Sequence, residues 1–152
     1  MRSLARHQGA PASMETIRKD MAFNDEKMIG ESSFAQYMGA MKSIFVVEDM
    51  PAWNPNLRSK TAIRTTDTRY FNDSSIASAA LGVEPADLMQ DLNTMGFLFE
   101  TMVVRDLRVY AGALNGKVYH YRDKSGLECD AVVHLRNGSY GFGNQTRWRL
   151  SD

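Results

Sequence analysis

The sequence has a single cysteine, no long apolar run and no excess of either charge. With Cys129 alone among 152 residues, the chain cannot form an internal disulfide, and such a composition fits a reducing cytoplasm. No apolar stretch approaches the roughly 20 residues of a membrane span, and residues 1–12 lack the apolar centre of a signal peptide. The formal net charge is zero, so the whole molecule is not attracted to nucleic acid or anionic membranes. We expect a cytoplasmic protein without membrane contact, in which nucleic-acid binding needs a local basic patch.

Two chemical motifs are also absent. No G-x-x-x-x-G-K-[ST] segment occurs, so this chain by itself cannot bind and hydrolyse ATP through a P-loop. The three histidines lie far apart and never at H-x-x-x-H spacing, which makes a zinc site improbable.

The first half of the chain predicts three helices and a strand. Ser13 is a suitable N-cap for the second helix, and Ser32 or Ser33 for the third. The third helix carries apolar residues at helical spacing, namely Phe34, Tyr37, Met38, Met41 and Ile44. The β-rich segment from Ile44 to Val47 follows. This order is typical of a winged helix-turn-helix, which we place at residues 1–69.

A basic segment follows the predicted strand. Asp67 is the one acid among its four basic residues, Arg58, Lys60, Arg64 and Arg69. They could contact a phosphate backbone. An ordinary solvated hairpin explains them equally well, and the sequence leaves both readings open.

The second half predicts three more helices. Asp73 caps a helix over 74–81 that Gly82 closes, and Pro85 opens a short helix to Asp91. The longest helix is expected from Asn93 to Leu114. Its predicted apolar side consists of Met95, Leu98, Phe99, Met102, Val103, Leu107, Tyr110 and Leu114.

A sheet of three antiparallel strands is predicted after this helix. The first two strands run from Val118 to Arg122 and from Leu127 to Leu135, and Asn137-Gly138 indicates a hairpin leading to a third, Tyr140 to Arg147. The fold class is therefore α+β, with the long helix packed on this sheet in a second domain, residues 70–152.

The middle strand carries the candidate site. Because side chains alternate along a strand, Glu128, Asp130, Val132 and His134 share the face expected to be open. Glu128 and Asp130, with Glu100 from the long helix, could hold a divalent metal. The alternative is a solvated strand face, with Glu100 a surface carboxylate or a partner of Arg105.

Two runs of residues carry a resemblance. NPNLRSKTAIRTTDTRYFNDSSIASAALG and GFLFETMVVRDLRVYAGALNGKVYHYRDKSGLECDAVVHL resemble a bacterial and archaeal family of AAA-type P-loop ATPases. Members of that family carry a winged helix-turn-helix and a C-terminal domain of unassigned function, which is similar to the PD-(D/E)XK restriction-endonuclease-like fold. The segment RSLARHQGAPASMETI resembles the start of the winged-helix portion. The resemblance implies a truncated nuclease-like fold here, without the ATPase domain.

The chain departs from the nuclease signature where the resemblance implies catalysis. The family tends to place Glu-x-Lys on the strand after the hairpin, and those positions hold Asn144 and Thr146. Thr146 cannot supply the positive charge that positions the attacking water, and Mg²⁺ or Mn²⁺ would depend on Asp130 and Glu100. We therefore expect a vestigial site of Glu100, Glu128, Asp130, Asn144 and Thr146.

Two functions remain after the sequence is read. The favoured one is a non-catalytic regulatory module that binds a protein partner or nucleic acid and needs no cofactor. The alternative is a metal-dependent nuclease with an altered site, which would use Mg or Mn. Homo-oligomer formation stays open.

Overall fold

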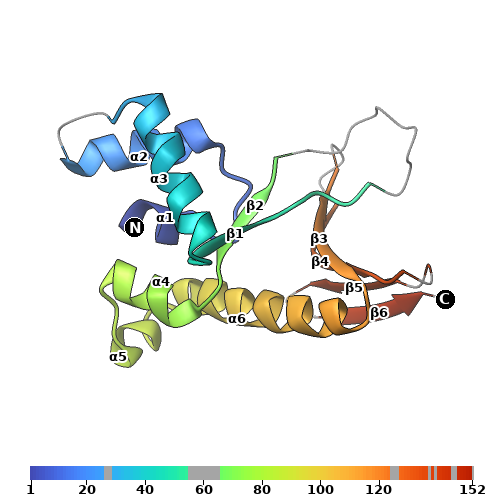
Figure 1. Ribbon diagram of the computed structural model, residues 1–152. Helices are drawn as coiled ribbons and strands as arrows, with labels where there is room; N and C mark the ends of the chain where they lie inside the picture. The colour runs from blue at the N-terminus through green and yellow to red at the C-terminus, as the bar shows by residue number, and fades with distance from the viewer. Residues whose placement is uncertain are drawn as a thin grey trace. The chain divides into compact units, whose positions relative to one another are not determined.

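The computed structural model describes residues 1–25, 29–54, 66–123, 127–136, 138, 140–144 and 147–151 (Figure 1). For residues 24, 25, 140, 142–144 and 147–151 it describes the backbone without the side chains. Gly141 is described in full. The chain forms two compact units, the first of residues 1–49 and 69–102 and the second of residues 50–68 and 103–152. Helices and sheets occur together, which confirms the α+β class.

The first unit is mainly helical. Its elements, in chain order, are α1 (Arg2–Arg6), α2 (Met14–Asp25), α3 (Glu31–Ser43), β1 (Val47–Met50), β2 (Thr68–Phe71), α4 (Ser74–Leu81), α5 (Pro85–Leu88) and the first half of α6 (Leu92–Ala113). Strands β1 and β2 form a two-stranded sheet. Three helices followed by a strand match the predicted order (Figure 1). The winged-helix fold and the domain boundary after residue 69 stay predictions.

The core of the first unit collects side chains from most of its helices. Its buried residues include Leu4, Ile17, Phe34, Met38, Phe71, Ala77 and Leu98. Each of these side chains except Ala77 is large and apolar, and contributes about 1.5–3 kcal/mol when it leaves water. The core therefore holds α1 to α4 and the start of α6 in one packed group.

Local capping signals set several helix ends as the sequence predicts. The Ser13 hydroxyl accepts the Thr16 amide at 3.0 Å at the start of α2, and the Asp73 carboxylate accepts the Ser75 amide at 2.8 Å at the start of α4. Gly82 ends α4 with a φ of 73°, a left-handed conformation that glycine adopts without strain. These contacts join residues close in sequence, so they were predictable.

The predictions for α3 are partly wrong. The helix begins at Glu31 after Gly30, so Ser32 and Ser33 lie inside its first turn and neither is its cap. Phe34 and Met38 are buried, whereas Tyr37 and Ile44 are 59% and 67% exposed. The helix thus buries a narrower stripe than predicted. Because it runs to Ser43, strand β1 starts at Val47 rather than Ile44.

The second unit contains a four-stranded antiparallel sheet. Its strands are β3 (Lys117–Arg122), β4 (Glu128–His134), β5 (Tyr140–Asn144) and β6 (Arg147–Ser151), in that spatial order. The prediction of three strands is wrong, because Arg147 does not end the third strand but begins a fourth. The segment Arg147-Trp148-Arg149-Leu150 alternates polar and apolar residues, which is a strand pattern too short to stand out.

Helix α6 begins and ends within one residue of its predicted limits. Its buried residues are Leu98, Glu100, Thr101, Val104 and Ala111. Most of the predicted apolar side is exposed instead, since Met95, Phe99, Met102, Tyr110 and Leu114 are 36–67% exposed. Apolar residues surround α6, so periodicity alone selects the wrong side.

None of the helices that the structure describes combines the length and apolar character of a membrane span.

Candidate functional site

The predicted acidic residues fall in different units. Glu100 belongs to the first unit, and Glu128 and Asp130 belong to the second. Each group is described separately below. Among the described residues, three or more His, Cys, Asp or Glu side chains never gather closely enough to hold a metal ion.

Glu100 lies inside the first unit. Its residue is 9% exposed, and its Oε1 accepts a hydrogen bond from the Tyr70 hydroxyl at 2.5 Å. Tyr70, on β2, is itself 2% exposed. A buried carboxylate is costly unless hydrogen bonds replace its water, and the Tyr70 phenol supplies one of them. Within the first unit, Glu100 is therefore a buried carboxylate, and its interpretation as a surface carboxylate is wrong.

Gly9 closes the space above this pair. A β-carbon at position 9 would lie 3.3 Å from Glu100 Oε1 and 3.6 Å from the Tyr70 ring, and Gly9 has a φ of 70°. The Gly9 amide donates to the Arg69 carbonyl at 2.9 Å. The loop after α1 therefore passes directly over the carboxylate, and a larger residue at position 9 would be strained.

A second polar contact lies beside Glu100. Thr101 is fully buried, and its Oγ1 lies 3.1 Å from Gln8 Oε1 and 2.9 Å from the Phe97 carbonyl. Gln8 is 4% exposed. We call Gln8, Gly9, Tyr70, Glu100 and Thr101 the Glu100 cluster. It joins the loop after α1, strand β2 and helix α6 through buried polar contacts, which is a structural role.

The two acidic residues of strand β4 differ in their exposure. Glu128 is exposed and forms an ion pair with Arg122, its register partner on β3. Asp130 is half-buried. Val132, predicted on the same open face, is fully buried. Glu128 at the start of this face and His134 at its end are exposed, so the prediction of an open strand face is wrong in its middle, at Val132.

The sheet register relates Asp130 to the end of β5. Ala131 pairs with Gly143, so continuing that antiparallel register by one residue would place Asn144 opposite Asp130. The Asn144 side chain and Thr146 lie outside the described residues. The backbone alone thus puts the Asn144 position beside Asp130, where the resemblance expects a nuclease carboxylate.

The structure describes one of the four basic residues that the sequence proposes for nucleic-acid binding. Arg58, Lys60 and Arg64 lie outside the described residues. Arg69, on β2, is 9% exposed. Its Nε lies 3.1 Å from Asp49 Oδ1, and its Nη1 donates to the Ala12 carbonyl at 2.6 Å. Lys42 also pairs with Asp49. The Arg69 guanidinium is therefore held inside the first unit, where it links β1 and β2 to the loop before α2.

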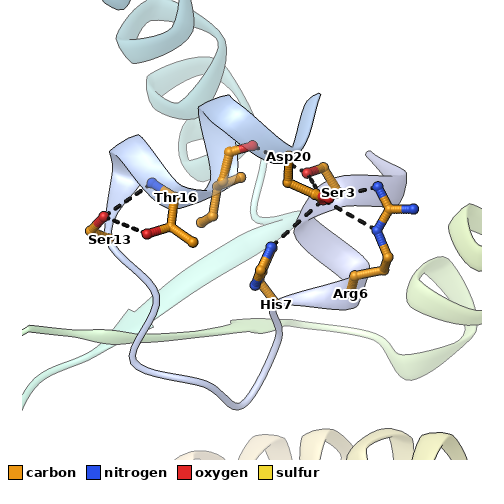
Figure 2. Close-up of polar contacts among 7 residues, drawn as sticks. Ser3, Arg6, His7, Ser13, Thr16 and Asp20 are labelled. Carbon is orange, nitrogen blue, oxygen red and sulfur yellow. Dashed lines mark hydrogen bonds and ion pairs between the residues drawn. The ribbon is translucent and has the colours of Figure 1, made fainter. Parts of the chain in front are cut away.

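A polar cluster that the sequence analysis missed joins α1 to α2 (Figure 2). Asp20 accepts hydrogen bonds from Ser3 and from Arg6, the latter at 2.9 Å, and His7 Nε2 lies 3.6 Å away. Burial raises the pKa of Asp20, but the hydrogen bonds from Ser3 and Arg6 outweigh it and hold this pKa below its ordinary value. The sequence contains a signal for this cluster, because Ser3, Arg6 and His7 stand at positions i, i+3 and i+4 and so share one helix face.

This cluster has the residue types of a catalytic triad without its geometry. The one proton of the Ser3 hydroxyl is within reach of both Asp20 and the Ile17 carbonyl, whereas a triad serine gives its proton to the histidine. The cluster therefore fastens α1 to α2 and does not activate a nucleophile.

Among the described residues of the second unit, His120 is the buried titratable group. It is 6% exposed, and its Nε2 lies 3.1 Å from the Thr66 carbonyl. Burial lowers the pKa of His120 below 6.5. Its backbone accepts the Trp53 amide at 2.6 Å and donates to Pro51 at 3.1 Å. Residues 51–53 thus add a short parallel bridge to the edge of β3.

Comparisons with known proteins give two family matches. A profile described as a domain of unknown function, DUF8612, matches residues 1–87, and one described as a domain of unknown function, DUF4143, matches residues 95–142. The second match covers the FLFE and YRDKSGLE motifs and hints at an ATPase-associated C-terminal domain. No curated protein and no solved structure matches the chain. Because the first match spans more than half of the 152 residues, the chain belongs to the DUF8612 family.

Proposed function

We propose that this chain is a non-catalytic module that binds a protein partner. The observation that carries the proposal is the state of Glu100. Its carboxylate is buried, accepts the Tyr70 hydroxyl at 2.5 Å and lies beneath Gly9. A catalytic metal needs carboxylate oxygens that face water and substrate. The Glu100 carboxylate instead accepts a hydrogen bond that stabilises the packing of the first unit.

The other candidate carboxylate, Glu128, supports the same reading. It forms an ion pair across the strands with Arg122, which is the usual role of opposite charges that face each other on a sheet. Thr146 replaces the lysine of the nuclease signature. Under the proposal, residues 70–152 keep a restriction-endonuclease-like scaffold, and the chemistry has been lost from it.

A protein partner fits the surface better than nucleic acid does. Eight large apolar residues along α6 and just beyond it are exposed, and such apolar surface is typical of protein interfaces. The net charge is zero, and Arg69 is held by Asp49. Nucleic-acid binding would depend on Arg58, Lys60 and Arg64, whose affinity would fall steeply with salt.

A nicking assay tests the non-catalytic part of the proposal. We expect the full chain to leave supercoiled plasmid intact in millimolar Mg²⁺ or Mn²⁺. Nicking by the wild type that disappears in Asp130→Ala would overturn the proposal. The Glu31→Gln variant is the control, because it removes an exposed acid that belongs to no candidate site.

The metal-dependent nuclease is the second candidate, and one observation favours it. Continuing the register of β4 and β5 one residue past Ala131 and Gly143 would set position 144 opposite Asp130, which would bring two oxygen ligands to one metal ion. If Mn²⁺ bound the folded chain, it would raise the melting temperature in a concentration-dependent manner. We expect no rise at millimolar Mn²⁺. A rise that Asp130→Ala abolishes would favour the nuclease.

Salt-dependent DNA binding tests the choice of partner. We expect little binding to a DNA duplex at 150 mM salt. Binding whose salt dependence becomes shallower when Arg58, Lys60 and Arg64 are all changed to Ala would replace the protein partner by nucleic acid.

A further inference from the structure

Within the first unit, the opening turns of α6 carry a row of exposed apolar side chains. At 100° per residue they project within an arc of about 80°, and we call them the 92–102 stripe: Leu92, Met95, Phe99 and Met102. They are 36–64% exposed. The buried residues Leu98 and Thr101 leave the helix on a different side. Isolated exposed apolar residues are ordinary, whereas a row along one helix marks an interaction surface.

Gly96 lies inside this row, one turn after Leu92 and one turn before Phe99. Glycine within a helix is less favourable than alanine. A β-carbon at position 96 would meet nothing within 4 Å beyond its chain neighbours and the backbone of its own helix turns, so packing within the chain does not require the glycine. Its missing side chain leaves the backbone of α6 open to a close neighbour between two large apolar residues.

The spacing of the stripe indicates the shape of that neighbour. Its four residues follow one another by three, four and three positions. This is the 3.5-residue repeat with which one helix packs against another. A second helix therefore fits the stripe, with its apolar side toward Phe99 and Gly96.

The charges around the stripe indicate the chemistry of that helix. Lys and Arg make up 18 of the 152 residues, but none of them, and no His, falls between residues 70 and 102. Three acids of this segment are exposed close before the stripe or at its start, namely Glu84, Asp87 and Asp91. The Asp91 carboxylate accepts the Thr94 amide at 3.1 Å and the Thr94 hydroxyl at 2.7 Å, which holds its charge at the N-terminus of α6.

Other parts of the first unit balance their charges. Asp20 pairs with Arg6 between α1 and α2, and Glu15 pairs with Arg18 within α2. The segment of residues 70–102 has acids and no base of its own. Charges of opposite sign across an interface favour binding and select the partner. A second copy of this segment brings no positive charge to meet the three acids, whereas a helix with Lys or Arg beside its apolar side does.

We propose that the 92–102 stripe binds an amphipathic helix of another protein, with apolar residues of that helix on the stripe and its Lys or Arg residues beside Glu84, Asp87 and Asp91. This inference rests on the proposed function, since it names the chemistry of the protein partner. Two of the four stripe residues are methionines, whose flexible side chains adapt to different apolar partners. The surface therefore selects by charge and helical shape.

Calorimetric titration of the full chain with a synthetic helix tests the apolar contact. The probe is a peptide of roughly 14 leucines and lysines, with leucine at the 3.5-residue repeat. We expect it to bind, and Phe99→Ala should weaken it at least tenfold, because exposed aromatic residues dominate such contacts. Tyr37→Ala is the matched control, since Tyr37 on α3 is 59% exposed and Phe99 is 58% exposed. Absence of binding, or equal losses in the two variants, overturns the proposal.

Replacing lysine by glutamate in the probe tests the charge selection. The glutamate peptide should bind at least tenfold more weakly to the wild type, because it meets like charges. Asp87→Asn combined with Asp91→Asn should weaken the lysine peptide about fivefold at low salt. Both asparagines keep an oxygen for the Glu84 and Thr94 amides that the aspartates accept. Glu31→Gln combined with Glu48→Gln, exposed acids of α3 and β1, should change nothing. Indifference to the sign of the peptide charge contradicts the proposal.

NMR amide shifts and sedimentation identify the occupant. The lysine peptide should shift amides of residues 92–102 and leave those of α2 in place; shifts confined to other helices reject the site. Self-association of the chain alone that Phe99→Ala abolishes would make the occupant a second copy and also reject the proposal. These results are separate from the nicking assay. A chain that leaves plasmid intact but ignores the lysine peptide rejects this inference alone, and nicking that Asp130→Ala abolishes rejects the proposed function alone.

Discussion

The two units of the molecule hold their charged side chains in opposite ways. In the first unit, the Arg69 and Asp49 side chains are 11% and 24% exposed, and Glu100 is buried against Tyr70. In the second unit, the Arg122 and Glu128 side chains are 33% and 46% exposed. A buried pair costs several kcal/mol when one partner is lost, whereas a surface pair contributes about 1 kcal/mol or less. Charged residues of the same types therefore stabilise the packing of the first unit, whereas in the second unit they form solvent-exposed pairs.

The largest effect is expected for Arg69→Met. This change leaves Asp49 partly buried with Lys42 as its remaining named cation and removes the contact to the Ala12 carbonyl. We expect the free energy of unfolding to fall by about 3 kcal/mol, measured by urea denaturation. Arg122→Met is the matched control in the second unit and should cost less than about 1 kcal/mol. Equal losses would show that the two ion pairs do not differ as burial suggests.

A smaller effect is expected for Tyr70→Phe. The change keeps the ring but removes the hydroxyl that donates to Glu100 at 2.5 Å, so a buried carboxylate loses a hydrogen bond. We expect a loss of about 2 kcal/mol in the free energy of unfolding. In an Glu100→Gln background the same change should cost clearly less, because the charge is gone. Tyr37→Phe, at an exposed position, serves as the control and should be neutral. Loss of the same size in both backgrounds would contradict a direct contact.

The smallest effect is a difference in pH dependence between the units. Burial lowers the pKa of His120 below 6.5, so the unfolded chain binds a proton that the folded second unit resists. Stability from this group is complete above pH 6.5 and falls as the pH drops below that value. The pKa of Asp20 lies below 3.8, where burial is outweighed by hydrogen bonds from Ser3 and Arg6. Its contribution is lost only as the pH falls below 3.8.

Hydrogen exchange followed by NMR distinguishes the pH range of the His120 effect from that of the Asp20 effect. Between pH 7 and pH 5, amides of β3 should lose protection and those of α1 and α2 should not. The variant His120→Gln should remove the loss on β3. A decline in α1 and α2 over the same range would contradict the assignment of the two pKa shifts.

Residues near each other in sequence made parts of the fold predictable. Helix α4 begins after Asp73 and ends before Gly82, as predicted, because a cap and a left-handed glycine act on neighbouring backbone groups. The limits of α6 followed from its long helical run. The fourth strand was missed because a five-residue strand gains its stability from the neighbour it pairs with, not from its own sequence.

The candidate site was less predictable than the fold. The sequence placed Glu100 near the predicted apolar side of its helix, but its partner Tyr70 lies 30 residues away, and Gln8 lies 93 residues from Thr101. Arg69 looked like a phosphate-binding residue because its three basic neighbours in sequence suggested a patch. The structure gives it Asp49 and the Ala12 carbonyl instead.

The sequence by itself determined the α+β class, the ends of α4 and α6, and the absence of a P-loop, because these depend on residue types within a few positions of one another. The tertiary structure alone decided which side of α6 is buried and which charges are neutralised. Burial is set by side chains that arrive from distant parts of the chain, and a helix with apolar residues all round offers no local reason to prefer one side.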